Sequence, residues 1–134
     1  ESVGTMLTKG AHGTTFGGNP LAAAAALATL DTIEAESLMD NVTAVGAHLR
    51  SEIGAIDGVR EVRGEGLLLG IGLEAPVSAR VVAAALEAGF IINAPTPDTI
   101  RLAPALNLST AQADDFIEWL RGYAASHPLA SEER

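Results

Sequence analysis

Apolar residues recur at steps of three or four between positions 38 and 56 and form one stripe: Leu38, Val42, Val45, Leu49, Ile53 and Ile56. This spacing matches the 3.6-residue period of an α-helix, so it predicts an amphipathic helix whose stripe faces a core. His48 falls off the stripe, and we expect it to be a solvated helix residue. Asp57-Gly58 then predicts the end of this helix.

Two further helices are predicted from signals at their starts. Asn19 followed by Pro20 indicates a helix over residues 20–33, because asparagine caps a helix and proline fits its first turn. The alanine-rich sequence that follows has high helix propensity. Ser109 and Gln112 have the spacing of a capping box, which predicts the last helix of the chain.

A fourth helix is predicted over residues 78–88, with Gly89 at its end. Its expected inward residues are Val81, Val82, Ala85 and Leu86. Short apolar runs separated by glycine and proline predict strands over residues 59–63, 67–73, 90–93 and 99–102, with a rigid loop over 94–98.

The predicted order of elements is therefore α-α-β-β-α-β-β-α. Short links between consecutive strands favour an α+β fold, in which helices pack on a small, mostly antiparallel sheet. We expect residues 1–33 to form an N-terminal arm and connecting helix, and residues 34–134 to form one compact domain.

Composition narrows the classes of function. The chain has 134 residues, 48% of them apolar, and a net charge of −9 from 17 acidic and 8 basic residues. Without clustered lysine and arginine we expect no binding of nucleic acid, and no apolar run is long enough to predict a membrane span. The chain lacks cysteine and its three histidines lie far apart, so we expect no disulfide, no metal site and a cytoplasmic protein.

A glycine-rich stretch, Gly10-Ala11-His12-Gly13-Thr14-Thr15-Phe16-Gly17-Gly18-Asn19-Pro20, leads into the first predicted helix. Hydroxyl groups and backbone N–H groups in such a loop can bind an anion. Loops of this composition are more often plain tight connections, and this one lacks the lysine of a nucleotide P-loop. Both interpretations stay open on the residues alone.

Arg101 stands in an otherwise apolar predicted strand, Ile100-Arg101-Leu102-Ala103-Pro104. Because burial of an unpaired guanidinium is prohibitive, Arg101 must face outward or have a partner. The plainer interpretation is an exposed residue that pairs with a nearby acid. The sharper one is a clamp for a carboxylate, which the planar guanidinium can bind through two parallel hydrogen bonds.

Three ordered strings, T-T-F-G-G-N-P-L, V-R-G-E-G-L-L-L-G-I and N-A-P…I-R-L-A-P, resemble the class-III (ornithine and acetylornithine type) pyridoxal-phosphate aminotransferases. The resemblance runs from about Leu7 to Tyr123 and implies the small C-terminal domain of a fold-type-I enzyme with its active site at a homodimer interface. It implies that Thr15 donates to the cofactor phosphate held by the neighbouring subunit, that Thr14 lies near the substrate, and that Arg101 holds the substrate α-carboxylate.

The reaction that the resemblance implies moves an amino group from N-acetylornithine to 2-oxoglutarate with pyridoxal 5'-phosphate. In this family the lysine that binds the cofactor lies upstream of the T-T-F-G-G-N-P string, so we reject Lys9 for that role and assign no chemistry to His12. Because the chain starts at Glu1, we expect a segment of a longer protein. Alone, it should be inactive, with no catalytic residue and no bound cofactor.

Two alternatives remain at this point. One is a sister enzyme of the same family that acts on ornithine, 4-aminobutyrate or diaminopelargonate. The other is a stand-alone α+β module that binds a small acidic molecule through Arg101 and the glycine-rich loop.

Overall fold

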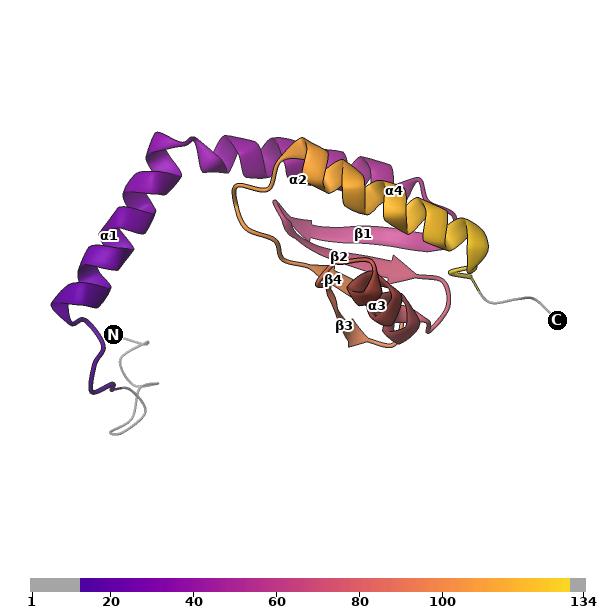
Figure 1. The fold of residues 1–134 in the computed structure, drawn as a ribbon, viewed down its shortest axis with the longest axis horizontal. Helices are drawn as coiled ribbons and strands as arrows, with labels where there is room; N and C mark the ends of the chain where they lie inside the picture. Colours follow the sequence, from indigo (N-terminus) through magenta and orange to yellow (C-terminus); the bar gives the residue numbers. More distant parts are fainter. Residues whose placement is uncertain (1–12, 131–134) are drawn as a thin grey trace, which may run out of the picture. The chain divides into compact units, whose positions relative to one another are not determined.

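The computed structural model describes residues 13–130, and the chain divides into two compact units, Glu1–Glu36 and Ser37–Arg134. The predicted division after residue 33 falls inside the first helix, which continues to Ala35. The predicted order of helices and strands is confirmed (Figure 1). The elements are α1 (Pro20–Ala35), α2 (Leu38–Gly54), β1 (Val59–Glu65), β2 (Leu68–Leu73), α3 (Ser78–Glu87), β3 (Asn93–Thr96), β4 (Thr99–Leu102) and α4 (Thr110–Ser126).

Helix α1 begins as its sequence predicts. Pro20 occupies the first turn, and the Asn19 side chain accepts a hydrogen bond of 3.0 Å from the backbone N–H of Ala22. No residue of α1 is buried, and Leu27 and Leu30 are more than half exposed. The helix therefore gains its order from propensity and capping.

The second unit contains a four-stranded sheet in the order β1-β2-β4-β3, and every neighbouring pair is antiparallel. Strands β1 and β2 form a hairpin that reverses at Gly66 and Leu67. Gly66 has a φ of 53°, a left-handed conformation that glycine adopts without steric cost. The predicted small, antiparallel α+β sheet is thus confirmed.

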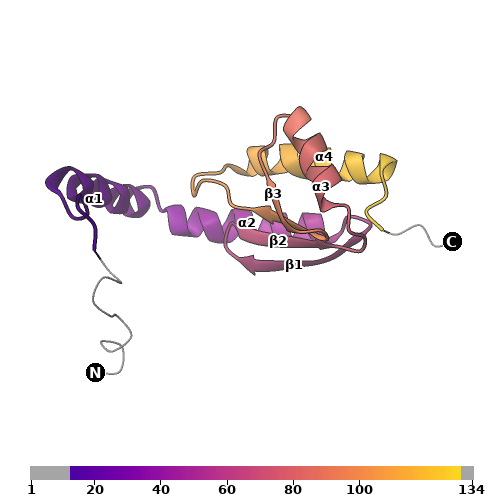
Figure 2. The same cartoon turned by 90° about the horizontal axis from the view of Figure 1, so that it is seen from below.

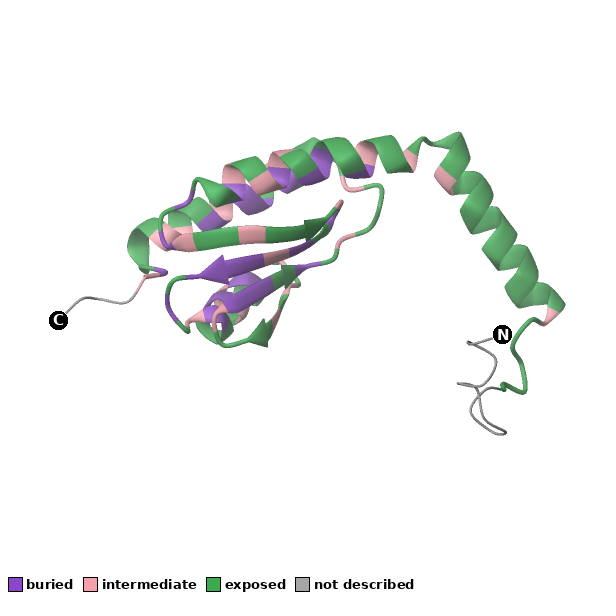
Figure 3. Cartoon of the chain, turned by 180° about the vertical axis from the view of Figure 1, so that it is seen from behind, coloured by how far each residue is buried: buried purple, intermediate pink, exposed green. Residues whose placement is uncertain are grey.

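The core lies on one face of this sheet. Buried residues of α2, α3 and α4 join one cluster with alternate residues of β2 and β4, so the three helices cover the same face (Figures 2 and 3). The strand residues in the cluster include Leu69, Ile71, Ile100 and Leu102. Five residues of the predicted apolar stripe are buried: Val42, Val45, Leu49, Ile53 and Ile56.

The strand predicted over residues 90–93 overlaps β3 only at Asn93, and the loop predicted over 94–98 is correct only for the turn at Pro97 and Asp98. Strand β3 runs from Asn93 to Thr96 and crosses Pro95, which is tolerated because β3 is an edge strand and its proline N is not needed for a ladder. Phe90 instead packs edge-on against Phe116 of α4, with ring centroids 5.4 Å apart. Phe90 and Ile92 pack against the core outside the sheet, whereas Ile91 is 91% exposed.

Two side-chain expectations also need correction. Leu86 was expected to face inward, but it is 64% exposed, because the short α3 buries only the stripe that contains Val81 and Ala85. His48 was expected to be solvated, but its Nε2 lies 2.6 Å from Oδ1 of Asp114 on α4. The neighbouring pair Glu52 and Arg121, 3.0 Å apart, also links α2 to α4.

Candidate functional site

Arg101 lies on β4 with its side chain exposed on the face of the sheet opposite the core. Its neighbours Ile100 and Leu102 are buried in the core, and successive residues of a strand point to opposite faces. We call this side the open face, defined by the cross-strand row Arg63, Gly70, Arg101 and Asn93. Because side chains alternate between the two faces of the sheet, the charged Arg101 can lie in an otherwise apolar strand without being buried.

The polar partner of Arg101 is a neutral amide. Its Nε donates a hydrogen bond of 3.1 Å to Oδ1 of Asn93, the residue opposite it on β3. Within residues 13–130, no carboxylate lies within ion-pair distance of Arg101. The nearby acid of the plainer interpretation is therefore not found among these residues, and the two terminal N groups can meet an external carboxylate.

Arg63, the other arginine of the row, has a different environment. Its Nη1 lies 2.5 Å from Oε1 of Glu61 on the same strand, so its charge is already compensated. Gly70 stands between Arg63 and Arg101 in the row and contributes no side chain. Of the two arginines in the row, Arg63 is thus compensated and Arg101 is not, and the Arg63 side chain lies over Gly70 between them.

Thr14 and Thr15 lie in the loop that precedes α1. Both are exposed, and neither hydroxyl takes part in a hydrogen bond within the described part of the chain. The side-chain N of Asn19 donates to the carbonyl of Phe16 at 2.6 Å, which fastens the loop to the start of α1. An added Cβ at Gly17 would overlap the methyl group of Thr14, so glycine leaves room for that side chain.

The two sets of predicted residues belong to different units. Thr14 and Thr15 lie in the first unit, and Arg101 lies in the second. Lys9 and His12 lie outside the described residues.

Sequence reasoning missed two polar residues beside the predicted site. Asn93 is one, and it gave no signal beyond its place in the N-A-P string. Asp98, in the turn from β3 to β4, is the other; its Oδ1 accepts from the Thr96 hydroxyl at 2.8 Å, and its Oδ2 lies 3.1 Å from Nη2 of Arg60. The Thr96 hydrogen bond and then the Arg60 guanidinium hold the pKa of Asp98 below its ordinary value.

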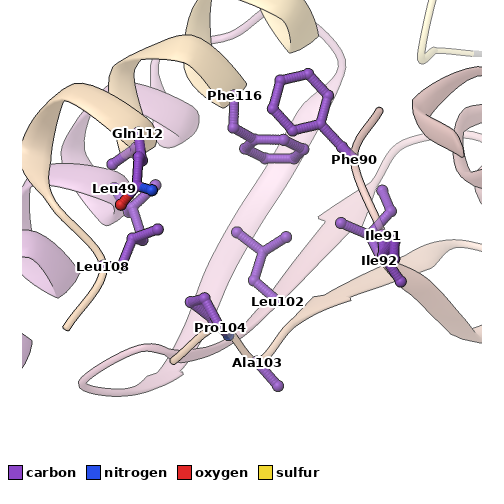
Figure 4. Close-up of a pocket in the computed structure, with 11 residues that line it drawn as sticks. Leu49, Phe90, Ile91, Ile92, Leu102, Ala103, Pro104, Leu108, Gln112 and Phe116 are labelled. Atoms are coloured by element: carbon purple, nitrogen blue, oxygen red, sulfur yellow. The ribbon is translucent and has the colours of Figure 1, made fainter. Parts of the chain in front are cut away.

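An apolar cavity of about 150 Å³ lies on the core side of the sheet (Figure 4). It is bounded by α2, by α4, by the residues just before β3 and by those at the end of β4. Phe90, Leu102 and Phe116 line it, and Gln112 is the only polar side chain that does so. None of its lining residues is titratable, so the groups suited to bind a carboxylate lie elsewhere, on the open face.

Among residues 13–130, no group of three or more histidine, cysteine or acidic residues is arranged to hold a metal ion. None of the helices in the same range combines the length and the apolar content needed to cross a bilayer.

Comparison with known proteins decides the family. The model of the aminotransferase class-III family matches residues 1–123. The chain belongs to the class-III aminotransferases. The predicted resemblance is thereby confirmed over almost the whole chain.

Individual relatives of this class-III aminotransferase chain agree. The acetylornithine aminotransferase of Streptomyces coelicolor is 51% identical over 119 residues, which make up 87% of this chain and 30% of that protein. The crystal structure of acetylornithine aminotransferase from Elizabethkingia anophelis matches with a TM-score of 0.77 and 32% identity, covering 92% of this chain and 34% of that one. An ornithine aminotransferase structure from Toxoplasma gondii matches with a TM-score of 0.75 and 28% identity, covering 94% and 32%.

The chain spans about 30% of the length of the curated relatives it matches. The four-stranded sheet and its helices therefore correspond to one part of the longer aminotransferase chains of those relatives.

Proposed function

We propose that this chain is the part of an acetylornithine aminotransferase that places the substrate carboxylate and the cofactor phosphate. The observation that carries the proposal is Arg101, an exposed guanidinium on the open face whose Nε binds a neutral amide and which has no acid within ion-pair distance among residues 13–130. The acetylornithine aminotransferase named above, at 51% identity, supports the choice of substrate.

The reaction of such an enzyme transfers an amino group from N-acetylornithine to 2-oxoglutarate. Both molecules carry a carboxylate, so each can bind one guanidinium in turn, although the α-carboxylate of N-acetylornithine is remote from the reacting Cδ and 2-oxoglutarate has one carboxylate on the reacting carbon and one remote from it. Arg101 would bind one such carboxylate through two parallel hydrogen bonds, which fixes the position of the rest of the molecule. Bound pyridoxal phosphate would supply the electron sink for the transfer.

Thr15 is the residue proposed to meet the cofactor phosphate, and Thr14 the residue proposed to lie beside the substrate. The loop fits a phosphate because both hydroxyls are exposed without a hydrogen-bond partner in the described residues, and because it opens a helix, whose N-terminal end favours an anion. A hydroxyl donates a single hydrogen bond, so Thr15 would contribute one contact and leave its neighbours' N–H groups for others.

A homodimer belongs to the same proposal, because Thr15 would act on the cofactor held by a second copy. The apolar residues that α1 leaves exposed, Leu21, Leu27 and Leu30, support an assembly in which this helix is covered.

An enzyme for ornithine is the second candidate. The structure of the Toxoplasma gondii ornithine aminotransferase matches this chain almost as well as the Elizabethkingia anophelis enzyme, with TM-scores of 0.75 and 0.77. The shared carboxylate clamp suits both amino donors equally. Sequence identity therefore favours acetylornithine, and the fold alone does not.

The proposal is tested by replacing Arg101 in the full-length enzyme. Arg101→Ala should lower kcat/KM for N-acetylornithine and for 2-oxoglutarate by roughly 30- to 1000-fold, because a lost charge-assisted carboxylate pair costs about 2–4 kcal/mol. Steady-state kinetics with each substrate varied in turn measures the effect.

Arg63→Ala is the matched control, since it removes a guanidinium from the same face whose charge Glu61 already compensates. It should leave both kcat/KM values within about twofold of the unaltered enzyme. An Arg101→Ala enzyme that kept both values within threefold would contradict the proposed clamp.

A further inference from the structure

We propose that Asn93 is a positioning residue, which fixes the orientation of the Arg101 guanidinium for a carboxylate without neutralising its charge. The inference rests on the proposed clamp and adds a residue to it. Its starting point is the 3.1 Å hydrogen bond from Nε of Arg101 to Oδ1 of Asn93.

The register of the edge strand explains why these two side chains meet. On β4 two steps separate Thr99 from Arg101, but on β3 three steps separate their partners Thr96 and Asn93. An odd step would turn one side chain to the core, so β3 takes up an extra residue as an irregularity between these two pairs. This irregularity brings Asn93 onto the open face directly opposite Arg101.

The geometry of guanidinium binding explains what the contact would achieve. A guanidinium is planar, and a hydrogen bond at Nε fixes the rotation of the whole plane. With Nε occupied by Asn93, the two Nη groups remain to bind a carboxylate. The Arg101 side chain is then ordered before the substrate arrives, so it loses less conformational entropy when the substrate binds.

The choice of an amide in place of an acid is the informative feature. On the same face Arg63 is paired with the carboxylate of Glu61, which compensates its charge. An acid at position 93 would do the same to Arg101 and would compete with the substrate. The amide orients the guanidinium through a weaker hydrogen bond and leaves its full positive charge for the ligand.

The opposite side of Arg101 carries no acid of its own row. Gly70 is its partner on β2 and has no side chain, and the Arg63 side chain lies over Gly70, with Cγ 3.6 Å and Nε 3.7 Å from the place of an added Cβ. Arg101 therefore has an orienting amide on one side and, across Gly70, a second guanidinium that is paired with Glu61 on the other.

The test compares Asn93→Asp with Asn93→Ala in the full-length enzyme. Asn93→Asp should raise KM for N-acetylornithine and for 2-oxoglutarate by about tenfold or more, while kcat changes less, because the introduced carboxylate occupies the guanidinium. This KM increase should shrink as the pH falls and the introduced carboxyl is protonated. Asn93→Ala should raise KM by about threefold to tenfold at every pH, because it loosens the arginine without competing for it.

Asn107→Asp is the matched control, because Asn107 is exposed before α4 and its side chain forms no hydrogen bond within residues 13–130. It adds the same charge and should leave KM unchanged. Independently of activity, the Nε–H signal of Arg101 in the NMR spectrum of the 134-residue chain should shift and exchange faster with water in Asn93→Ala than in Asn107→Asp.

The outcomes separate the two proposals. Suppose that Arg101→Ala loses carboxylate affinity but both Asn93 variants keep KM within twofold: the positioning role is then overturned and the clamp stands. The same conclusion follows if the Arg101 Nε–H signal is unchanged in Asn93→Ala. If Arg101→Ala itself keeps its affinity, both proposals fail together. A KM increase in Asn93→Asp that persists unchanged at low pH would also count against the role, because it would reflect structural damage.

Discussion

At the scale of single residues, Asp98 shows how one residue, through its carboxylate and its backbone carbonyl, contacts three strands. Its side chain accepts from Thr96 on β3 and pairs with Arg60 on β1, and its backbone carbonyl accepts from the N–H of Leu73 on β2 at 2.8 Å. Arg60 also donates to the carbonyl of Leu73 at 2.9 Å. The Thr96 hydrogen bond and then the Arg60 guanidinium favour the ionised form of Asp98, so its pKa lies below the ordinary value.

The lowered pKa of Asp98 predicts how the stability of the chain depends on pH. A group whose pKa is lower in the folded protein stabilises it above the unfolded pKa, about 3.9 for Asp, and this contribution disappears as the pH falls through the folded value. Asp98→Asn should therefore lower the urea midpoint at pH 7, and the difference from the unaltered chain should narrow below about pH 4. Asp115→Asn, an exposed control on α4, should show no such trend; a deficit for Asp98→Asn that is independent of pH would refute the assignment.

Sequence reasoning could find Arg101 but not its partner. A charge in an apolar strand is visible in the sequence, because burial would be costly. Asn93 meets Arg101 only because β3 takes up an extra residue, and nothing in the residues marks that register. The contact of His48 with Asp114 was missed for a related reason, since helix periodicity does not tell which surface residues face a second helix.

At the scale of elements, α2 depends on a close approach to the β1–β2 hairpin at Gly46. An added Cβ there would overlap the backbone carbonyl oxygen of Gly66, whereas a Cβ at Gly54, at the end of the same helix, would meet no atom within 4 Å. Glycine at position 46 is therefore required by the close packing of α2 on the hairpin, whereas glycine at position 54 only lowers the helix propensity of α2.

Gly46→Ala should destabilise the chain by about 1–3 kcal/mol through overpacking, although alanine is the better helix former. Gly54→Ala should stabilise it by about 0.4–1 kcal/mol, because the substitution fits without strain and restricts the unfolded chain. Urea unfolding followed by the fluorescence of Trp119, which packs among the aromatic side chains of the core, measures both. Equal stability of the two variants would show that α2 does not rest on the hairpin.

Most elements were predictable because their local signals agree with their packing. The apolar stripe of α2, the N-cap of α1 and the capping box of α4 are examples, and the structure confirms them. The strand predicted over 90–93 was placed too early because Phe90 packs against α4 outside the sheet, while the strand itself begins at Asn93 and runs through Pro95. Edge strands are the elements for which a proline is a poor argument against β structure.

At the scale of the whole molecule, the two units differ in what holds them together. The second unit has its own core between the sheet and three helices, whereas α1 of the first has no buried residue. The chain spans about 30% of the length of its curated relatives. We propose that this segment places the substrate carboxylate and the cofactor phosphate, and that the covalent chemistry belongs to another part of a longer enzyme.

The measurement that tests this account most directly is glutamate formation from 2-oxoglutarate by the full-length enzyme with pyridoxal phosphate. N-acetylornithine, ornithine, 4-aminobutyrate and diaminopelargonate are compared as amino donors, and the 134-residue chain alone serves as the control. The account predicts the highest kcat/KM for N-acetylornithine and no glutamate from the 134-residue chain. A higher kcat/KM for another donor, or turnover by the 134-residue chain alone, would contradict it.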